Sequence, residues 1–314
     1  MTTLDRLERW KNSGAITDEQ HNVIAALVRK DRFSVFLELN ILLYLGVLSF
    51  VAGAGWTVRE YFASLGDVAV VGALTIVVAL SFWYCFSRTR PYSNLPVESP
   101  TLAFDYILYL GCLMFAVELG YLENQFHLLS SQWNYYLIFS AVVYFVFAYR
   151  FDNRFVLTLA LSTLATWFGV RTSVFESLRL LPALRTSAMA FAATALLIGG
   201  LPYRAGIKKH FFATHLHIAT NVFLAAMLTG VDRNDTWWCL PALLAVSAVA
   251  IWGGLRFRRF AFVAYGVIYA YIAISIRILE TNSSFETALS YFFVSGVIVL
   301  LALILLARRV AREP

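Results

Sequence analysis

Ten apolar segments, each 16 to 23 residues long, constrain the fold of this chain more than any other feature. They cover residues 35–57, 68–87, 102–122, 133–149, 155–170, 186–203, 211–231, 237–255, 260–276 and 287–307. A helix that crosses a bilayer needs about 20 largely apolar residues, because the hydrocarbon core is about 30 Å thick. The segments therefore predict an all-α, polytopic transmembrane bundle of about ten spanning helices.

The composition excludes two other classes of protein. Of the 314 residues, 60 % are apolar and only 14 % are charged, whereas an average soluble domain carries roughly 25 % charged residues. So much apolar surface is too large for the core of a soluble enzyme, and it is not typical of a disordered chain. The longest connection between segments, 171–185, has 15 residues, so no catalytic domain fits outside the membrane.

The distribution of Lys and Arg predicts the orientation. With residue 1 in the cytoplasm, 19 of the 25 cations fall on the cytoplasmic side and 6 on the other side. Cytoplasmic loops are enriched in Lys and Arg, so we expect both termini to be cytoplasmic. The net charge of +6 then reflects topology, and no nucleic-acid partner is expected, because such binding needs cations gathered on one solvated face.

Three parts are expected along the chain: a cytoplasmic helical hairpin at 1–32, the ten-helix transmembrane domain at 35–307, and a short basic cytoplasmic tail at 308–314. In the hairpin, Gly14 is expected to end the first helix. Thr17 to Gln20 is a capping box that opens the second helix. A hairpin this small does not bury enough surface to be stable alone, so it is expected to dock on the membrane domain, on a second copy or on a partner protein.

A spaced motif opens the chain, Leu7-x-x-Trp10-x-x-x-Gly14-x-Ile16-Thr17-x-x-Gln20, and the first apolar segment after it contains Leu45-Gly46, Gly53 and Trp56. This order resembles the predicted bacterial membrane proteins of domain-of-unknown-function family 2157. The likeness covers about the first 70 residues and the multi-span pattern, with Gly55 where the family pattern has Asn. The resemblance implies a multi-pass protein of the bacterial inner (cytoplasmic) membrane. It implies no settled activity and supplies no catalytic residues.

Ionisable and polar residues inside the apolar segments are the candidate site residues, because they are costly in hydrocarbon. Near the predicted cytoplasmic ends lie Glu38, Asp105, Tyr109, His217 and Asn221. Asp105 and Tyr109 share one helix face, as do His217 and Asn221. Two interpretations stay open: these residues line a path for a ligand or a proton near segments 35–57, 102–122 and 211–231, or they form hydrogen bonds between packed helices.

Glu118 lies near the opposite membrane face, where we expect it to pair with Arg171 or Arg185. No catalytic signature such as H-E-x-x-H, G-x-S-x-G or a P-loop is present in the sequence. The three cysteines have no metal-ligand spacing. We therefore expect no metal and no cofactor, and the sequence does not favour an enzyme.

Two functions follow as the main hypotheses. The first is small-molecule binding or transport within the lipid bilayer through the polar path. The alternative is a non-transporting scaffold or regulatory protein that recruits a protein partner, or forms a homo-oligomer, through residues 1–32. A third hypothesis, an intramembrane transferase, requires Glu38, Asp105 and His217 to share one cavity.

Overall fold

The computed structural model describes residues 3–18, 20–21, 45–53, 66–129, 132–170, 181–231, 236–281 and 285–312. All regular structure among these residues is helical, and they contain no β-strand. The prediction of an all-α protein is therefore confirmed. The chain divides into two compact units, residues 1–64 and residues 65–314.

The described part of the first unit shows how the N-terminal sequence folds. Helix α1 (Thr3–Asn12) ends in a turn in which Gly14 adopts a φ of 71°, a conformation that glycine adopts without steric cost. The capping box is confirmed, because Thr17 Oγ1 accepts from the Gln20 amide at 3.2 Å and Gln20 Oε1 accepts from the Thr17 amide at 3.0 Å. Residues 45–53 of the first expected span are helical, and Glu38 lies outside the described residues.

The second unit contains nine long helices among its described residues. They are α4 (Asp67–Arg88), α5 (Leu102–Phe126), α6 (Asn134–Phe151), α7 (Arg154–Val170), α8 (Leu181–Arg204), α9 (Phe212–Leu228) with the preceding 3₁₀ turn η4 (Lys209–Phe211), α10 (Cys239–Arg256), α11 (Phe260–Thr281) and α12 (Phe285–Arg312). Each corresponds to one expected apolar segment, with ends that differ by five residues or fewer. The last helix continues through the expected basic tail as far as Arg312.

Eight helices in the described part of the chain are long and apolar enough to cross a membrane: α4, α5, α6, α8, α9 with η4, α10, α11 and α12. Helix α7 is apolar but shorter, with 17 residues or about 25 Å of length. Its packed face is nevertheless buried, since Leu157, Ala160 and Leu161 are inaccessible to solvent. Among the described residues, α7 therefore packs its buried face against neighbouring helices, chiefly α6 and α8.

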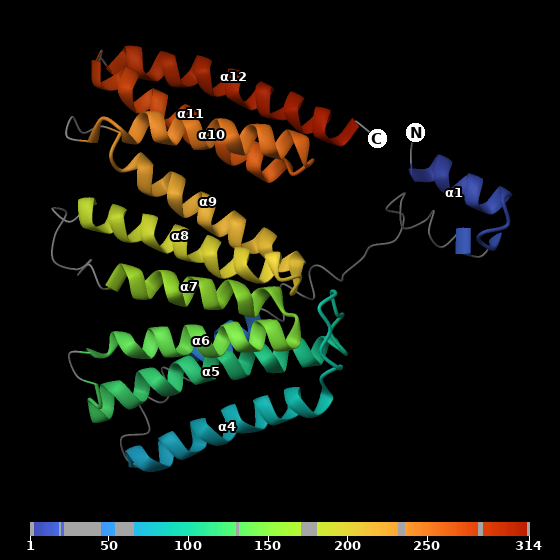
Figure 1. Ribbon diagram of the computed structural model, residues 1–314, viewed down its shortest axis with the longest axis vertical. Coiled ribbons are helices and arrows are strands. Elements are labelled where there is room, and N and C mark those ends of the chain that lie inside the picture. The colour runs from blue at the N-terminus through green and yellow to red at the C-terminus, as the bar shows by residue number, and fades with distance from the viewer. Residues whose placement is uncertain are drawn as a thin grey trace. The chain divides into compact units, whose positions relative to one another are not determined.

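Within the second unit, the helices follow one another in chain order from α4 to α12 (Figure 1). The most extensive contacts join α4 with α5, α6 with α7, α8 with α9, and α10 with α11, so each of these hairpins is a packing unit. The connections within the four hairpins lie at the same end of the unit (Figure 1), which we call the connection end.

Apolar side chains join neighbouring hairpins, and a glycine permits close packing within one hairpin. Leu224 and Met227 of α9 pack with Leu243 of α10 and Ala273 of α11 in one buried cluster. At Gly199 of α8 an added Cβ would lie 2.5 Å from the His215 ring, so α8 and α9 approach closely there. Small residues permit this kind of contact between membrane helices.

Candidate functional site

The α6–α7 connection consists of two residues whose side chains reach the core of the connection end. Asp152 ends α6 in the left-handed conformation, at a φ of 55°. Asn153 begins α7, because its Oδ1 accepts from the Val156 amide at 3.1 Å. Asp and Asn are among the few residues that tolerate left-handed geometry and that cap helices through their side chains. The dipeptide thus stops one helix and starts the next.

The Asp152 carboxylate is the centre of a buried charge cluster. Its Oδ2 lies 2.9 Å from Lys208 Nζ and 2.5 Å from the Val97 amide, and its Oδ1 lies 2.5 Å from His210 Nε2. The side chains of Asp152 and Lys208 are only 3 % and 1 % exposed. Burial raises the pKa of Asp152, but the hydrogen bonds from Lys208, the Val97 amide and His210 outweigh burial and leave the pKa of Asp152 below its usual value.

Asp105 joins this cluster through the α6–α7 connection. Its Oδ1 accepts from Ser99 Oγ at 2.7 Å and from Asn153 Nδ2 at 2.9 Å. The same Asn153 amide lies 3.1 Å from the Tyr109 hydroxyl. The structure therefore brings together two of the expected site residues, Asp105 and Tyr109, and each has a hydrogen-bond partner, as a structural role requires.

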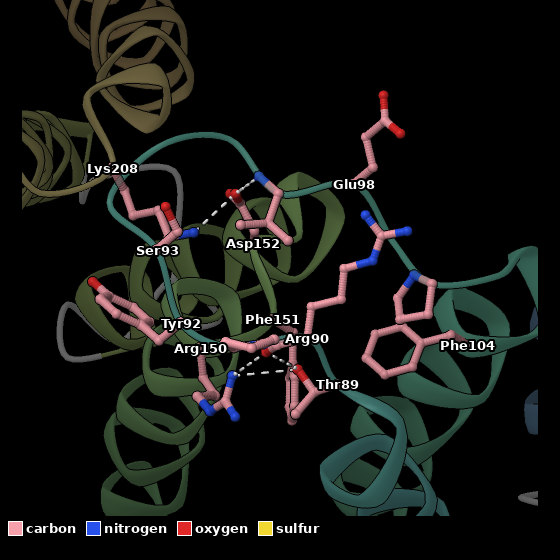
Figure 2. Close-up of a pocket in the computed structure, with 13 residues that line it drawn as sticks. Thr89, Arg90, Tyr92, Ser93, Glu98, Phe104, Arg150, Phe151, Asp152 and Lys208 are labelled. Atoms are coloured by element: carbon pink, nitrogen blue, oxygen red, sulfur yellow. Dashed lines mark hydrogen bonds and ion pairs between the residues drawn. The ribbon is translucent and has the colours of Figure 1, made fainter.

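A small cavity lies beside the charge cluster (Figure 2). Its wall includes Tyr92, whose ring lies 5.3 Å from Lys208 Nζ, and Arg150, which donates to the Thr89 hydroxyl at 3.3 Å. Its volume is about 10 Å³, which is no more than one water molecule requires. The charge cluster is therefore suited to hold the connections of three hairpins together, and its own cavity is too small for a substrate.

A much larger cavity lies between α8, α9 and α10. Its volume is about 640 Å³, within the range of roughly 300–1,000 Å³ that is typical of ligand sites. Helix α9 lines it with Ala213, Leu216 and Thr220, which recur on one face. Most of the remaining wall is apolar: Leu196, Tyr203, Phe212, Val246, Val249, Ala250, Trp252, Gly253, Gly254, Phe257 and Phe262.

The cavity is open on one side and basic at one end. Val249 and Trp252 line it and are 66 % and 63 % exposed, so they form the rim of an opening on the surface of the unit. Lys209, His210 and Arg259 line the connection end, and no carboxylate lines the cavity. His210 belongs both to this wall and to the Asp152 cluster. The cavity thus combines apolar walls with a cationic mouth.

The other expected site residues on α9 lie behind the cavity wall. His217 stacks on Phe262 of α11, with ring centroids 4.3 Å apart, and meets the Tyr265 ring edge-on at 5.8 Å. The Asn221 amide donates to the His217 carbonyl at 2.9 Å. Since residue 217 lies about 100° around α9 from residue 216, His217 faces α11 while Leu216 faces the cavity. Asp105 and His217 thus contact different elements, the α6–α7 connection and α11.

The partner of Glu118 differs from the expectation. Its Oε1 accepts from the Thr75 hydroxyl of α4 at 2.5 Å. Arg185 lies instead over the Trp238 ring at 5.9 Å, and its Nη1 has no hydrogen-bond partner in the described part of the chain. Glu118 and Arg185 thus have different partners in the structure, and α4 is the helix that the buried face of α5 meets. Arg171 lies outside the described residues.

Sequence reasoning missed Asp152, Lys208 and the cavity. Lys208 was included only as one of the predicted cytoplasmic cations, and no role was predicted for Asp152, although the Asp-Asn pair between two apolar segments is a signal for a tight helix–helix junction. No signal identified the cavity. The described residues contain no group of three or more His, Cys, Asp or Glu that could hold a metal ion, and Cys85, Cys112 and Cys239 are buried free thiols.

Comparison with known proteins identifies one family. Residues 8–157 match the model of DUF2157, a family described as predicted membrane proteins. The resemblance stated from the N-terminal motif is therefore confirmed, and the match extends through α6 to the Asp152–Asn153 junction and the start of α7. No curated protein and no solved structure shows significant similarity to the chain. The chain is thus a membrane protein with several helices capable of crossing the bilayer.

Proposed function

We propose that this protein binds a small, largely apolar molecule in the cavity between α8, α9 and α10. The observation that carries the proposal is an opening of about 640 Å³ with apolar walls and a basic end. Ligand sites commonly combine apolar walls with a few placed polar groups, and they occur between the helices of bundles. Binding is the first step of transport, and translocation of the same molecule is the further hypothesis that uptake into proteoliposomes tests.

The proposal places the protein in the bacterial inner membrane, with ten spans and both termini in the cytoplasm. The cations of the described residues support this orientation. Arg88, Arg154, Arg204 and Arg256 stand at helix ends beside the connection end, as the positive-inside rule requires for a cytoplasmic face. Reporter fusions at residues 1 and 314 test it. Cytoplasmic reporter activity at both ends supports the topology, and periplasmic activity at either end contradicts it.

Binding can be tested by filling the cavity. Gly253 lines the cavity, and an added Cβ at this position meets no atom within 4 Å. The leucine side chain of Gly253→Leu therefore begins in open space and projects into the cavity. Gly72→Leu on α4 is the matched control, because Gly72 is also a helical glycine with open space around it and lies outside the cavity.

The probe is an uncharged dodecyl diazirine, photoactivated in protein-containing nanodiscs, with the labelled peptides identified by mass spectrometry. The proposal predicts labelling of the cavity-lining peptides of α8, α9 and α10 in the wild type and in Gly72→Leu. It predicts loss of that labelling in Gly253→Leu, while labelling of the exposed helix α12 persists. Equal labelling of the cavity peptides in all three proteins contradicts the proposal.

One observation favours a second function, a scaffold that recruits a partner or a second copy through residues 1–32. These residues belong to a compact unit separate from α4–α12, and Trp10 of α1 is 54 % exposed. Exposed aromatic side chains are enriched at protein interfaces. Deletion of residues 1–32 tests this function: it predicts loss of co-purifying protein with an intact membrane body, and unchanged co-purification contradicts it.

The polar path through Glu38, Asp105, Tyr109, His217 and Asn221 is a separate proposal for transport. The Asp105 carboxylate accepts hydrogen bonds from Ser99 and Asn153, so a substitution of Asp105 tests whether this residue does more than join neighbouring segments. Solute uptake that falls in both Asp105→Asn and His217→Ala supports the path. Equal uptake by the wild type and both variants contradicts it.

A further inference from the structure

We infer that the ligand of the cavity between α8, α9 and α10 is an anionic phospholipid from the leaflet at the connection end. The inference rests on the proposed function, to which it adds the chemical class of the ligand. Its acyl chain would lie along the apolar walls, and its phosphate would bind Lys209 and Arg259 at the mouth.

The position of the cavity along the helices matches one leaflet of a bilayer. Val246, its deepest lining residue on α10, lies ten residues before the helix ends at Arg256. At 1.5 Å per residue this distance is about 15 Å, which is half of the roughly 30 Å hydrocarbon core. Because α10 is itself a candidate span, the cavity runs from the end of the span to about the bilayer midplane.

The opening of the cavity faces the surroundings that supply a lipid. Leu196 of α8 and Val249 and Trp252 of α10 line the cavity and are also exposed. All three belong to helices that are candidate membrane spans. Their exposed apolar surface therefore faces hydrocarbon, and a lipid chain can enter sideways between α8 and α10 without passing through water.

The charge at the mouth selects an anion. Lys209 and Arg259 line the mouth, are exposed and form no ion pair with the described residues. The buried carboxylate of Asp152 contacts His210 but is already paired with Lys208. Its charge therefore does not cancel that of the mouth. Basic pockets between helices at a cytoplasmic face bind anionic lipid headgroups.

Other ligand classes use only half of these features. A free phosphate or another small soluble anion would bind the cations but leave the apolar walls empty. An uncharged lipid would fill the walls but leave two cations without a partner. The combination of a basic mouth with an apolar channel one leaflet deep favours a ligand that has both parts covalently joined.

The test is lipid retention measured by native mass spectrometry on protein released from nanodiscs. The nanodiscs contain phosphatidylcholine with a titrated fraction of phosphatidylglycerol. The variants are Lys209→Gln with Arg259→Gln, which removes the mouth charges, and Arg88→Gln with Arg90→Gln, which removes two exposed cations of the same end outside this cavity. Gly253→Leu, which fills the apolar channel, is the third variant, and circular dichroism verifies that all are folded.

The inference predicts that the wild type and the Arg88/Arg90 control retain phosphatidylglycerol in preference to phosphatidylcholine. The Lys209/Arg259 double variant should lose about 30-fold in apparent affinity for phosphatidylglycerol, the value for two cations at about 1 kcal/mol each. Gly253→Leu should retain neither lipid at this site.

Each other outcome has a distinct meaning. If the Lys209/Arg259 variant retains phosphatidylglycerol like the wild type while Gly253→Leu loses it, the anionic ligand is wrong and the apolar cavity site of the proposed function stands. If inorganic phosphate displaces the lipid from the wild type while Gly253→Leu still retains neither lipid, the mouth binds free phosphate and the inference is overturned. If Gly253→Leu retains lipid normally, both the inference and the proposed function fail.

Discussion

Replacement of Lys208 by Met tests whether the buried charge cluster stabilises the connection end. Met keeps much of the length of the lysine side chain but removes the ammonium group that lies 2.9 Å from Asp152. The variant leaves the Asp152 carboxylate 97 % shielded from solvent, with only the Val97 amide and His210 as partners. The expected result is a large loss of stability, because the lost contact cannot be replaced by water.

The magnitude follows from the separation and the burial of the pair. At 2.9 Å and an effective dielectric constant of about 20, the attraction is about 6 kcal/mol. Part of this attraction only offsets the cost of burying the Lys208 ammonium group, and the variant has no such group to bury. Removal of one partner from a buried ion pair typically costs about 3–5 kcal/mol, and this is the loss that we expect for Lys208→Met.

A double-mutant cycle separates the charge pair from simple packing. In Lys208→Met with Asp152→Asn both charges are absent, and the Asn oxygen can still accept from the Val97 amide. The double variant should therefore lose less stability than Lys208→Met alone, with a coupling energy of about 2 kcal/mol or more. Lys209→Met is the matched control, because Lys209 is the adjacent exposed lysine and should change stability by less than about 0.5 kcal/mol.

The assay is reversible unfolding of the detergent-solubilised protein by sodium dodecyl sulfate at pH 7.5, followed by circular dichroism. The predicted order of stability is wild type and Lys209→Met, then the double variant, then Lys208→Met. If Lys208→Met lies within about 1 kcal/mol of Lys209→Met, or if the two single changes add without coupling, the reasoning from the buried pair is refuted.

Three further predictions follow from individual contacts. The pKa of Asp152 is lower in the folded state than the usual value of about 3.9. Its contribution to stability is therefore complete above about pH 5 and is lost as the pH falls through the folded pKa. Acid unfolding should be shallower in Asp152→Asn, and an unchanged acid transition would assign the titration to other groups. Gly199→Ala should lower the free energy of unfolding by about 1–3 kcal/mol in the same assay, since its Cβ would lie 2.5 Å from the His215 ring. Gly200→Ala, which has open space around it, should lose no stability. Equal effects of the two changes would contradict the close contact of α8 and α9. Thr17→Ala should destabilise the second N-terminal helix by about 1 kcal/mol, because the cap on the Gln20 amide is lost. Faster protease cleavage after residue 17 would show this loss, and unchanged cleavage would contradict a stabilising cap.

The helices of the second unit could be predicted because hydrocarbon imposes a strong constraint on sequence. An apolar run of about 20 residues has few alternatives to a helix when lipid cannot hydrogen-bond the backbone. The start of α8 is one of the least accurate boundaries, because the helix begins at Leu181, five residues before the expected start. Pro182 lies in its first turn, where proline is tolerated because the amide there has no helical partner.

The candidate site could be predicted only in part, because it depends on which hairpins are neighbours. Asp105 and Tyr109 share a helix face by their spacing, and the structure gives them the common partner Asn153. Asp152 and Lys208 are 56 positions apart in the sequence, and nothing in either segment indicates that the α6–α7 and α8–α9 connections meet. Their contact follows from tertiary packing, which periodicity does not describe.

The cavity is the feature least accessible from the sequence. A helix face such as Ala213, Leu216 and Thr220 has the same pattern whether it meets another helix or an opening. The polar face of α9 led to the prediction of His217 as a site residue. The cavity instead lies against the neighbouring apolar face, and Phe262 separates His217 from the cavity. Vacant volume arises from side chains on three helices together, so no single segment indicates it.

The central claim is that a lipid-like ligand occupies the cavity between α8, α9 and α10, and a cryo-electron-microscopy map of the protein in phosphatidylglycerol-containing nanodiscs tests it most directly. The account predicts elongated non-protein density along Leu216 and Val246, with its head between Lys209 and Arg259, and loss of that density in Gly253→Leu. A map in which the helices close on one another and protein side chains fill the cavity would contradict the account.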